Sequence, residues 1–266
     1  MKIINQSVEI ITEPNPLKRI ELVGRVCWKS EHRITEDSAK PFVAGLIKRG
    51  HTSPLEHARV VVPRDSKSFI RYSISEPYGY SDRRRKTYKK GRVYAEMINV
   101  RDLWNVNRIF NQTAEMFVSD IEKLENASDY MTVKFITDIG MTRELLRHRQ
   151  MSFMELSTRY VNYRDGIEFI KPLRYDDNQT YRLGHSGMFE RIEMMYAGLI
   201  ETGCKPQEAR AILPLCTKTE LYMTGMLSQW KDVFALRESP AAHPQMRALM
   251  ALLRNEMKKH GIEVKK

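Results

Sequence analysis

The sequence of 266 residues predicts an α+β fold, in which a mixed or antiparallel sheet is flanked by helices. Short apolar segments that suit strands lie between longer helical patterns, but the two do not alternate as a doubly wound sheet requires. Hydrophobic residues make up 42% of the chain and charged residues 29%, which is sufficient for a buried core beneath a polar surface. We therefore expect one domain over 1–266, with an insertion at about 64–130.

The N-terminal region is expected to place two helices between short strands. Pro16 suits the first turn of a helix that we extend to about Trp28. Thr35, followed by two acidic residues, is a plausible N-cap for a second helix, which Gly50 ends. Strands are predicted near 8–11 and at 58–62.

The remaining elements follow from apolar periodicity and from glycine or proline at segment ends. We predict, in order, a strand at 93–100, a helix from Asn99 or Asn105 to about Leu124, a buried strand at 131–139 that Gly140 ends, a short helix or turn at 141–149, a strand at 168–170, a helix at 186–202, a helix from Pro206 to Pro214, a strand at 217–227, and helices at 228–236 and 244–260. No internal repeat or low-complexity segment interrupts this pattern.

Composition and cysteine spacing limit the class of protein. The three cysteines are scattered, which favours a reducing compartment over a disulfide framework, and their spacing suggests no metal site. No apolar run is long enough to span a bilayer, and the first residues do not resemble a signal peptide. We therefore expect a cytoplasmic protein with neither a membrane nor a metal partner.

The segment from Arg64 to Arg92 carries much of the formal net charge of +11, because it holds ten Lys or Arg against three Asp or Glu. Five tyrosines lie in or beside it, an arrangement that can bind single-stranded nucleic acid by stacking and charge. The same residues can line an entrance for anionic small molecules, or form a solvated hairpin or flap. We favour the solvated hairpin, so nucleic acid is not an expected partner.

The most informative segment is the basic run Arg147, His148 and Arg149, followed after seven residues by Ser157 and then by Arg159. Guanidinium groups bind phosphate and planar acceptor edges with several donors at once, and serine hydroxyls with backbone N–H groups can complete a phosphate site. A bare basic triplet is more often a solvated helix face. The serine and arginine that follow make ligand binding the better interpretation.

This spacing resembles the signature of the flavin-dependent thymidylate synthases, in which Arg-His-Arg is followed after seven residues by Ser. Two further segments match the family in the same order. The stretch 51–57, His-Thr-Ser-Pro-Leu-Glu-His, is similar to an early family element, and 208–214 contains Ala-Arg-Ala-Ile-Leu-Pro, with Leu-Arg following at Arg237. The resemblance covers residues 1–60 and 131–250.

The resemblance implies reductive methylation of dUMP to dTMP, a methyltransferase activity of nucleotide biosynthesis. FAD would be the cofactor, with NADPH and methylenetetrahydrofolate as co-substrates, and the enzyme would be a homotetramer with shared active sites. The family uses no cysteine nucleophile, which agrees with the absence of a histidine or a Gly-rich turn beside Cys216. No Gly-x-Gly-x-x-Gly follows a strand, so the flavin would not lie on a Rossmann fingerprint.

Position by position, the resemblance implies three sets of site residues. The cofactor-binding residues would be Ser53, Glu56, Arg147, His148, Arg149, Glu155 and Asp232. The substrate-binding residues would be Glu144, Arg147, Glu155, Leu156, Ser157, Thr158, Arg159, Arg210 and Arg237. Arg237 would be the catalytic residue, because a permanently cationic fork can polarise uracil and stabilise negative charge near N3.

Four positions depart from the family pattern. Glu144 stands where many members carry Gln toward the pyrimidine, and an ionised carboxylate can only accept hydrogen bonds. Met154 replaces a common Asn, and Met226 and Asp232 lie where relatives often have Asn near FAD. These changes leave room for an altered ligand geometry or a variant reaction.

Several alternatives stay open at this point. A related flavoenzyme that hydroxymethylates dUMP would carry almost the same residues. Arg210 can be a solvated surface residue, and Arg237 can serve as a cation at the C-terminus of its helix. Glu56 and His57 can form a local ion pair.

Overall fold

The computed structural model describes residues 1–63, 87–90 and 93–264. The chain divides into two compact units. The first unit comprises Met1–Ile11, Val26–Lys29 and Val133–Lys266, and the second comprises Thr12–Arg25 and Ser30–Thr132. The prediction of a single domain with an insertion at about 64–130 therefore stays a prediction, and each unit is described by itself.

The first unit is built on a four-stranded sheet in the order β2–β7–β10–β8. Its strands are β2 (Ser7–Ile10), β7 (Tyr130–Asp138, which enters this unit at Val133), β8 (Ser152–Glu155) and β10 (Lys218–Met226). β2 pairs antiparallel with β7, and β8 pairs antiparallel with β10. All nine residues of β10 are buried, as expected for a central strand covered on both faces.

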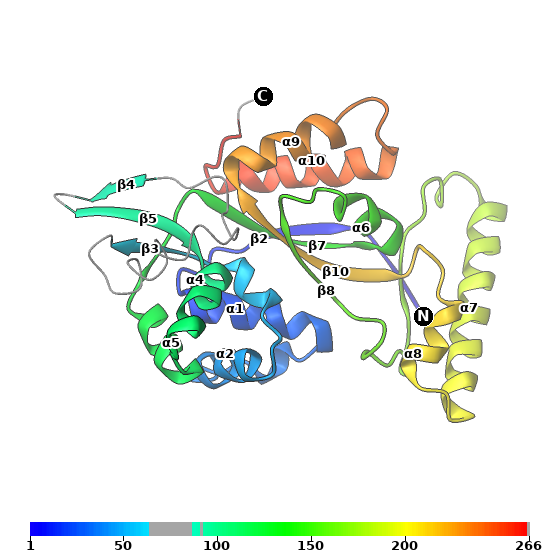
Figure 1. The fold of residues 1–266 in the computed structure, drawn as a ribbon. Helices are drawn as coiled ribbons and strands as arrows, with labels where there is room; N and C mark the ends of the chain where they lie inside the picture. Colours follow the sequence, from blue (N-terminus) through cyan, green and yellow to red (C-terminus); the bar gives the residue numbers. More distant parts are fainter. Residues whose placement is uncertain (64–86, 91–92, 265–266) are drawn as a thin grey trace. The chain divides into compact units, whose positions relative to one another are not determined.

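Helices and a small second sheet complete the first unit. The helical segments are η1 (Val26–Trp28), α6 (Ile139–Leu145), α7 (Gln179–Glu201), α8 (Pro206–Ala209), η6 (Arg210–Ile212), α9 (Leu227–Arg237) and α10 (Pro244–Lys259). α9 and α10 lie side by side, and α10 packs on β2 (Figure 1). β1 (Lys2–Ile4) and β9 (Glu168–Ile170) form a parallel pair.

The second unit combines helices with a sheet in the order β4–β5–β3–β6. Its strands are β3 (Arg59–Pro63), β4 (Thr87–Lys90), β5 (Val93–Asn99) and β6 (Glu125–Asn126). Its helical segments are α1 (Pro16–Arg25), η2 (Glu31–Arg33), α2 (Ala39–Lys48), η3 (Ser53–His57), α4 (Val100–Asn107), η5 (Arg108–Phe110) and α5 (Ala114–Glu122).

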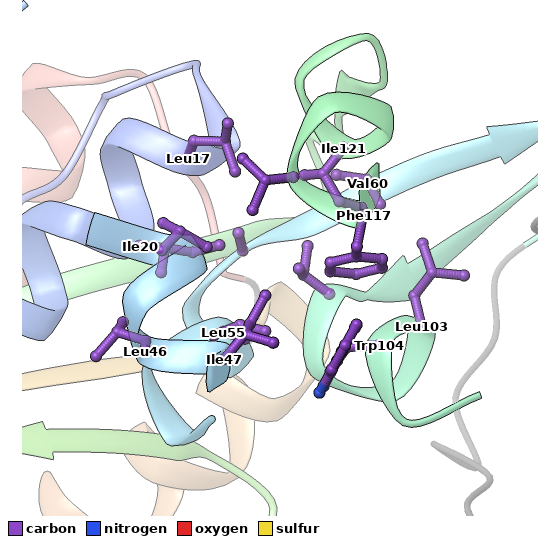
Figure 2. Packing of buried hydrophobic residues seen from close by; sticks show 14 of the residues in the cluster. Leu17, Ile20, Leu46, Ile47, Leu55, Val60, Leu103, Trp104, Phe117 and Ile121 are labelled. Carbon is purple, nitrogen blue, oxygen red and sulfur yellow. The ribbon is translucent and has the colours of Figure 1, made fainter. Parts of the chain in front are cut away.

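The core of the second unit is a cluster of aliphatic and aromatic side chains. Figure 2 shows Trp104 and Phe117, whose ring centroids lie 5.1 Å apart, among the aliphatic side chains of this cluster. Burial of these side chains from α1, α2, η3, β3, α4 and α5 supplies the apolar contact area that stabilises the unit. The predicted α+β class, with antiparallel strands flanked by helices, is confirmed.

Two predicted helices of the second unit have different limits. Thr35 is not an N-cap, because α2 starts after Ser38, whose hydroxyl accepts from the Thr35 N–H and donates to Glu21. The helix expected from Asn99 or Asn105 to Leu124 is broken into α4, η5 and α5. Asn111 takes the left-handed conformation at φ 58°, and the hydroxyl of Thr113 then caps α5.

The prediction of Gly50 as the end of α2 is confirmed. Gly50 has φ 72°, a conformation that glycine adopts without strain. The N–H groups of Gly50 and His51 donate to Ile47 and Leu46 at 3.0 and 2.9 Å, which satisfies carbonyls left open at the helix end.

Three elements of the first unit also differ from expectation. Gly140 does not end a strand but lies in the first turn of α6, because Asp138 caps that helix. β8 was not predicted, although it lies within the basic motif segment. α7 begins at Gln179 instead of near Ser186, because the side chain of Asn178 accepts from the N–H of Tyr181 at 2.7 Å.

Candidate functional site

The basic triplet is presented by α6, which directly follows the buried strand β7. Asp138 Oδ1 accepts from the N–H of Met141 at 2.8 Å, and its second oxygen accepts from Gln245 on α10. Burial raises the pKa of this carboxyl. The strand end, the cap and the link to α10 together fix the direction in which α6 leaves the sheet.

Replacing Asp138 by alanine is expected to destabilise the protein by about 1 kcal/mol, because the α6 cap and the acceptor for Gln245 are both lost. Asp138→Asn is the matched control: its amide oxygen still caps, its NH2 can donate to the Gln245 oxygen once that amide turns over, and it buries no charge, so stability should stay close to that of the wild type. Chemical unfolding compares the two. Equal losses in both variants would contradict a capping role.

Arg147 and Arg149 lie in the turn that ends α6. The N–H groups of Arg147 and His148 donate to the backbone carbonyls of Glu144 and Leu145 at 3.4 and 3.1 Å. The triplet therefore continues the last helical turn. Both arginine side chains are exposed and make no ion pair within the described residues, whereas His148 is half-buried. Cations are favoured at a helix C-terminus, so the arrangement is stable while leaving two guanidinium groups available.

Arg237, the last residue of α9, places its guanidinium against the end of α6. Its Nε–H donates to His148 Nε2 at 2.9 Å, and one N–H donates to Glu144 Oε2 at 3.0 Å. A further N–H donates to the Glu144 backbone carbonyl. That carbonyl also accepts from the Arg147 N–H, so Arg237 is a second donor at the C-terminus of α6, where a cation is favoured.

Burial and neighbouring charges shift the pKa values in this cluster. Partial burial, with Arg147 nearby, lowers the pKa of Arg237, and Glu144 opposes that shift. Partial burial, with the charge of Arg237, lowers the pKa of His148 below its usual value, and Asp232 opposes that shift. Neutral imidazole is therefore favoured at His148, as its role as acceptor from Arg237 requires.

Glu155 closes the side of the site formed by β8. Its Oε1 accepts from the hydroxyls of Thr142 on α6 and Thr219 on β10, at 2.8 and 3.1 Å. Burial raises the pKa of this carboxyl, and the two hydroxyl donors only partly oppose the shift. Glu155 thus joins three elements around one oxygen and leaves the second oxygen for another partner.

The chain then turns through Leu156, Ser157, Thr158 and Arg159. Leu156 is buried, and its N–H donates to the backbone carbonyl of Glu220 at 2.9 Å. The Ser157 hydroxyl accepts from the N–H of Arg159 at 3.3 Å, and Arg159 Nε–H donates to Gln207 on α8 at 3.1 Å. The turn therefore holds a hydroxyl and a guanidinium close to α8.

The structure does not bring every predicted site residue of the first unit into this cluster. Arg210 is exposed in η6, directly after α8, and makes no ion pair within the described residues, so its interpretation as a solvated residue stays open. Asp232 is exposed on α9, and its negative charge acts to raise the pKa of His148. Ser53 and Glu56 lie in η3 of the second unit. Ser53 is exposed, and Glu56 forms an ion pair with Arg101.

Three supporting residues were not predicted. Thr142 and Thr219 hold Glu155, and Gln229 accepts from the N–H of Met226 at 2.7 Å while donating to the Gln150 carbonyl at 2.8 Å. Gln229 ties the start of α9 to the basic motif. Its position three residues after a helix N-cap is the spacing of a capping box, a signal that sequence inspection can use. The two threonines have no such signal.

The thiols of Cys27 and Cys216 are not activated nucleophiles. Burial raises the pKa of Cys27, and likewise that of Cys216, to about 11. Both thiols therefore stay protonated at neutral pH. Within the described part of the chain, no group of His, Cys, Asp and Glu is placed to hold a metal ion, and no helix there has the length and apolar character that crossing a membrane requires.

The basic segment predicted to form a hairpin or flap falls mostly outside the described residues. In the described part of this segment, β4 pairs antiparallel with β5, from Thr87 opposite Glu96 to Lys90 opposite Val93. The alternatives of nucleic-acid binding and of an entrance for anionic ligands stay untested there.

Comparison with protein families gives one match. The family described as thymidylate synthase complementing protein matches residues 122–260, about half of the chain. This range contains α6, the basic triplet, β8, β10 and Arg237.

Curated relatives and solved structures are also similar to this chain. Proteins named flavin-dependent thymidylate synthase from Mycobacterium bovis and from Synechocystis are 30% identical over 131 residues and 28% identical over 144 residues. The matches cover 43% and 49% of this chain and 52% and 66% of those proteins, so the chain spans about half to two thirds of their length. A UMP/dUMP methylase from Streptomyces cacaoi is 19% identical with a TM-score of 0.48, over 99% of this chain and 93% of that one. That structural similarity is too low to support an assignment.

Proposed function

This chain belongs to the thymidylate synthase complementing protein family, and we propose that it is a flavin-dependent thymidylate synthase that methylates dUMP to dTMP. The observation that carries the proposal is the cluster of Arg237, His148 and Glu144 beside the exposed Arg147. An oriented, partly buried guanidinium stabilises negative charge that develops on a pyrimidine ring more strongly than a solvated one does.

The donors at the end of α6 fit an anionic dinucleotide such as FAD. Arg147 and Arg149 present two exposed guanidinium groups that make no ion pair within the described residues, and phosphate is their preferred partner. We propose that Arg147, His148, Arg149, Glu155 and Asp232 hold FAD. The family resemblance adds Ser53 and Glu56 to this set. FAD, when bound, supplies the electrons that reduce the transferred carbon.

The turn after β8 fits the phosphate of dUMP. The Ser157 hydroxyl, the backbone at Leu156 and Thr158, and the Arg159 guanidinium would bind its oxygens, and Arg210 would add a further cation. Arg237 and Glu144 would meet the pyrimidine edge, and Glu155 would lie between nucleotide and flavin. Because both partly buried thiols keep a raised pKa, activation of uracil would fall to Arg237 instead of to a cysteine.

The remaining elements of the proposal rest on the family resemblance. Methylenetetrahydrofolate would supply the carbon and NADPH would reduce the flavin. The enzyme would act in the cytoplasm as a homotetramer with active sites shared between subunits. Hydroxymethylation of dUMP is the alternative outcome, and product mass separates them, since its product carries one oxygen more than dTMP.

The first test is the absorbance spectrum of the purified protein with added FAD, followed by anaerobic NADPH and then dUMP. A bound-flavin spectrum that bleaches with NADPH and shifts with dUMP is expected. Arg147→Gln should weaken FAD binding at least about tenfold, whereas Arg182→Gln, an exposed arginine on α7, should not. A protein that takes up no FAD would contradict the proposal.

A further inference from the structure

The guanidinium of Arg237 donates three hydrogen bonds to protein groups. Arginine has five N–H donors, and three of them are engaged: Nε–H by His148, one terminal N–H by Glu144 Oε2, and one on the other terminal nitrogen by the Glu144 carbonyl. One N–H therefore remains on each terminal nitrogen. The number of remaining donors is thus set by two residues, Glu144 of α6 and His148 just after it.

We propose that His148 is a positioning residue for Arg237, which it holds through the Nε–H to Nε2 hydrogen bond, and that with Glu144 it leaves one N–H group on each terminal nitrogen for the substrate. The inference deepens the proposed function and rests on it for the identity of the substrate. It gives the histidine of the basic triplet a role toward the catalytic arginine, separate from any contact with flavin.

The geometry requires a neutral imidazole. His148 Nε2 accepts from a permanent cation 2.9 Å away, and a proton on Nε2 would replace this attraction with repulsion between two donors. The charged groups near the ring are Arg237 and Asp232 on α9, with Glu144 on α6 opposite the same guanidinium. Asp232 is exposed and therefore screened, so Arg237 dominates.

Acid pH is expected to break the contact between His148 and Arg237. Burial and Arg237 hold the pKa of His148 below its usual value of 6.5, so the ring stays neutral near neutral pH and the contact with Arg237 is intact. As pH falls through this lowered pKa, the ring protonates and releases Arg237. The guanidinium is then no longer fixed on its Nε side, and affinity for dUMP is expected to fall.

Glu144 fixes the opposite side of the fork. Its carboxylate and its own carbonyl hold both terminal nitrogens from one helical turn, so Arg237 is clamped to the end of α6. Glu144→Gln keeps an acceptor oxygen at the same place but removes the charge. We expect this variant to keep the His148 contact, because the Nε–H donor is not involved.

The first experiment uses histidine NMR and needs no ligand. The His148 resonance is identified by its loss in His148→Gln, and its pKa is measured in the wild-type protein and in Arg237→Gln. The proposal expects that removing Arg237 raises the pKa of His148 toward 6.5, by losing the nearby cation. An unchanged pKa would mean that burial alone lowers it, and this would overturn the proposal.

The second experiment measures the Kd of dUMP for the flavin-loaded enzyme from about pH 8 to about pH 5.5. His148→Gln places an amide oxygen, which cannot titrate, near the position of Nε2. Between the two ends of this pH range, the Kd of dUMP should therefore rise about tenfold less in His148→Gln than in the wild type. The second ionisation of the dUMP phosphate affects both proteins equally and cancels in the comparison. Parallel curves would overturn the proposal.

The two experiments separate this inference from the proposed function. A raised pKa of His148 in Arg237→Gln, in a protein that binds no dUMP, would support the positioning contact and contradict the assigned substrate. Binding of dUMP with an unchanged pKa would support the function and contradict the positioning role. His148→Ala, which offers no acceptor, should bind dUMP more weakly than His148→Gln at every pH.

Discussion

Replacement of Arg237 by lysine is expected to lower kcat/KM for dUMP about 10²- to 10³-fold while leaving the fold intact. Lysine keeps the charge but offers a single nitrogen, so it cannot contact His148 and Glu144 together and still present two N–H groups to a pyrimidine edge. The loss should appear in kcat as well as in KM, because the arginine would act on charge that develops during the reaction.

Steady-state and single-turnover kinetics with saturating flavin measure this effect. Arg247→Lys on α10 is the matched control, since that arginine is exposed and lies outside the cluster, and its kcat/KM should stay within about twofold of the wild type. Circular dichroism and bound-flavin absorbance show whether both variants are folded and loaded. If Arg237→Lys keeps nearly full activity, the guanidinium geometry is not required and the assigned catalytic role is wrong.

Replacement of Trp230 by alanine is expected to destabilise the protein by about 3–5 kcal/mol, because it removes the largest fully buried side chain of the structure's described part. The indole lies 6.4 Å from the ring of Phe135 on β7 and 6.3 Å from that of Phe234, measured between centroids. It therefore anchors α9 to the sheet. Because α9 carries Arg237, catalytic activity should also fall under conditions where the protein is still folded.

Urea unfolding monitored by circular dichroism gives the free-energy change. The control is Leu236→Ala on the same helix, where the side chain is 61% exposed and the expected change is below about 0.5 kcal/mol. Equal stability of Trp230→Ala and Leu236→Ala would show that α9 does not depend on its buried face for attachment.

Most element types could be predicted from local patterns, and the errors arose where side chains compete for backbone groups. The apolar segment at 131–139 and the stripe at 244–260 were predicted as a strand and a helix, and β7 and α10 confirm them. The start of α2 was misplaced because Thr35 and Ser38 are both suitable caps. The Ser38 hydroxyl donates to Glu21 on α1, and this contact between helices cannot be read from the local sequence.

In the candidate site, too, the sequence and the tertiary structure decide different things. The sequence alone determined which residue types are available: the basic triplet, the serine and arginine after it, and Arg237 at the end of a helix. Their chemistry is a property of each side chain, so it can be recognised without a fold. Tertiary structure decided their partners, since Arg237 meets His148 and Glu144 across 89 and 93 residues of chain. Contacts at such separations depend on how β7, α6, β10 and α9 pack, and no local periodicity encodes that packing.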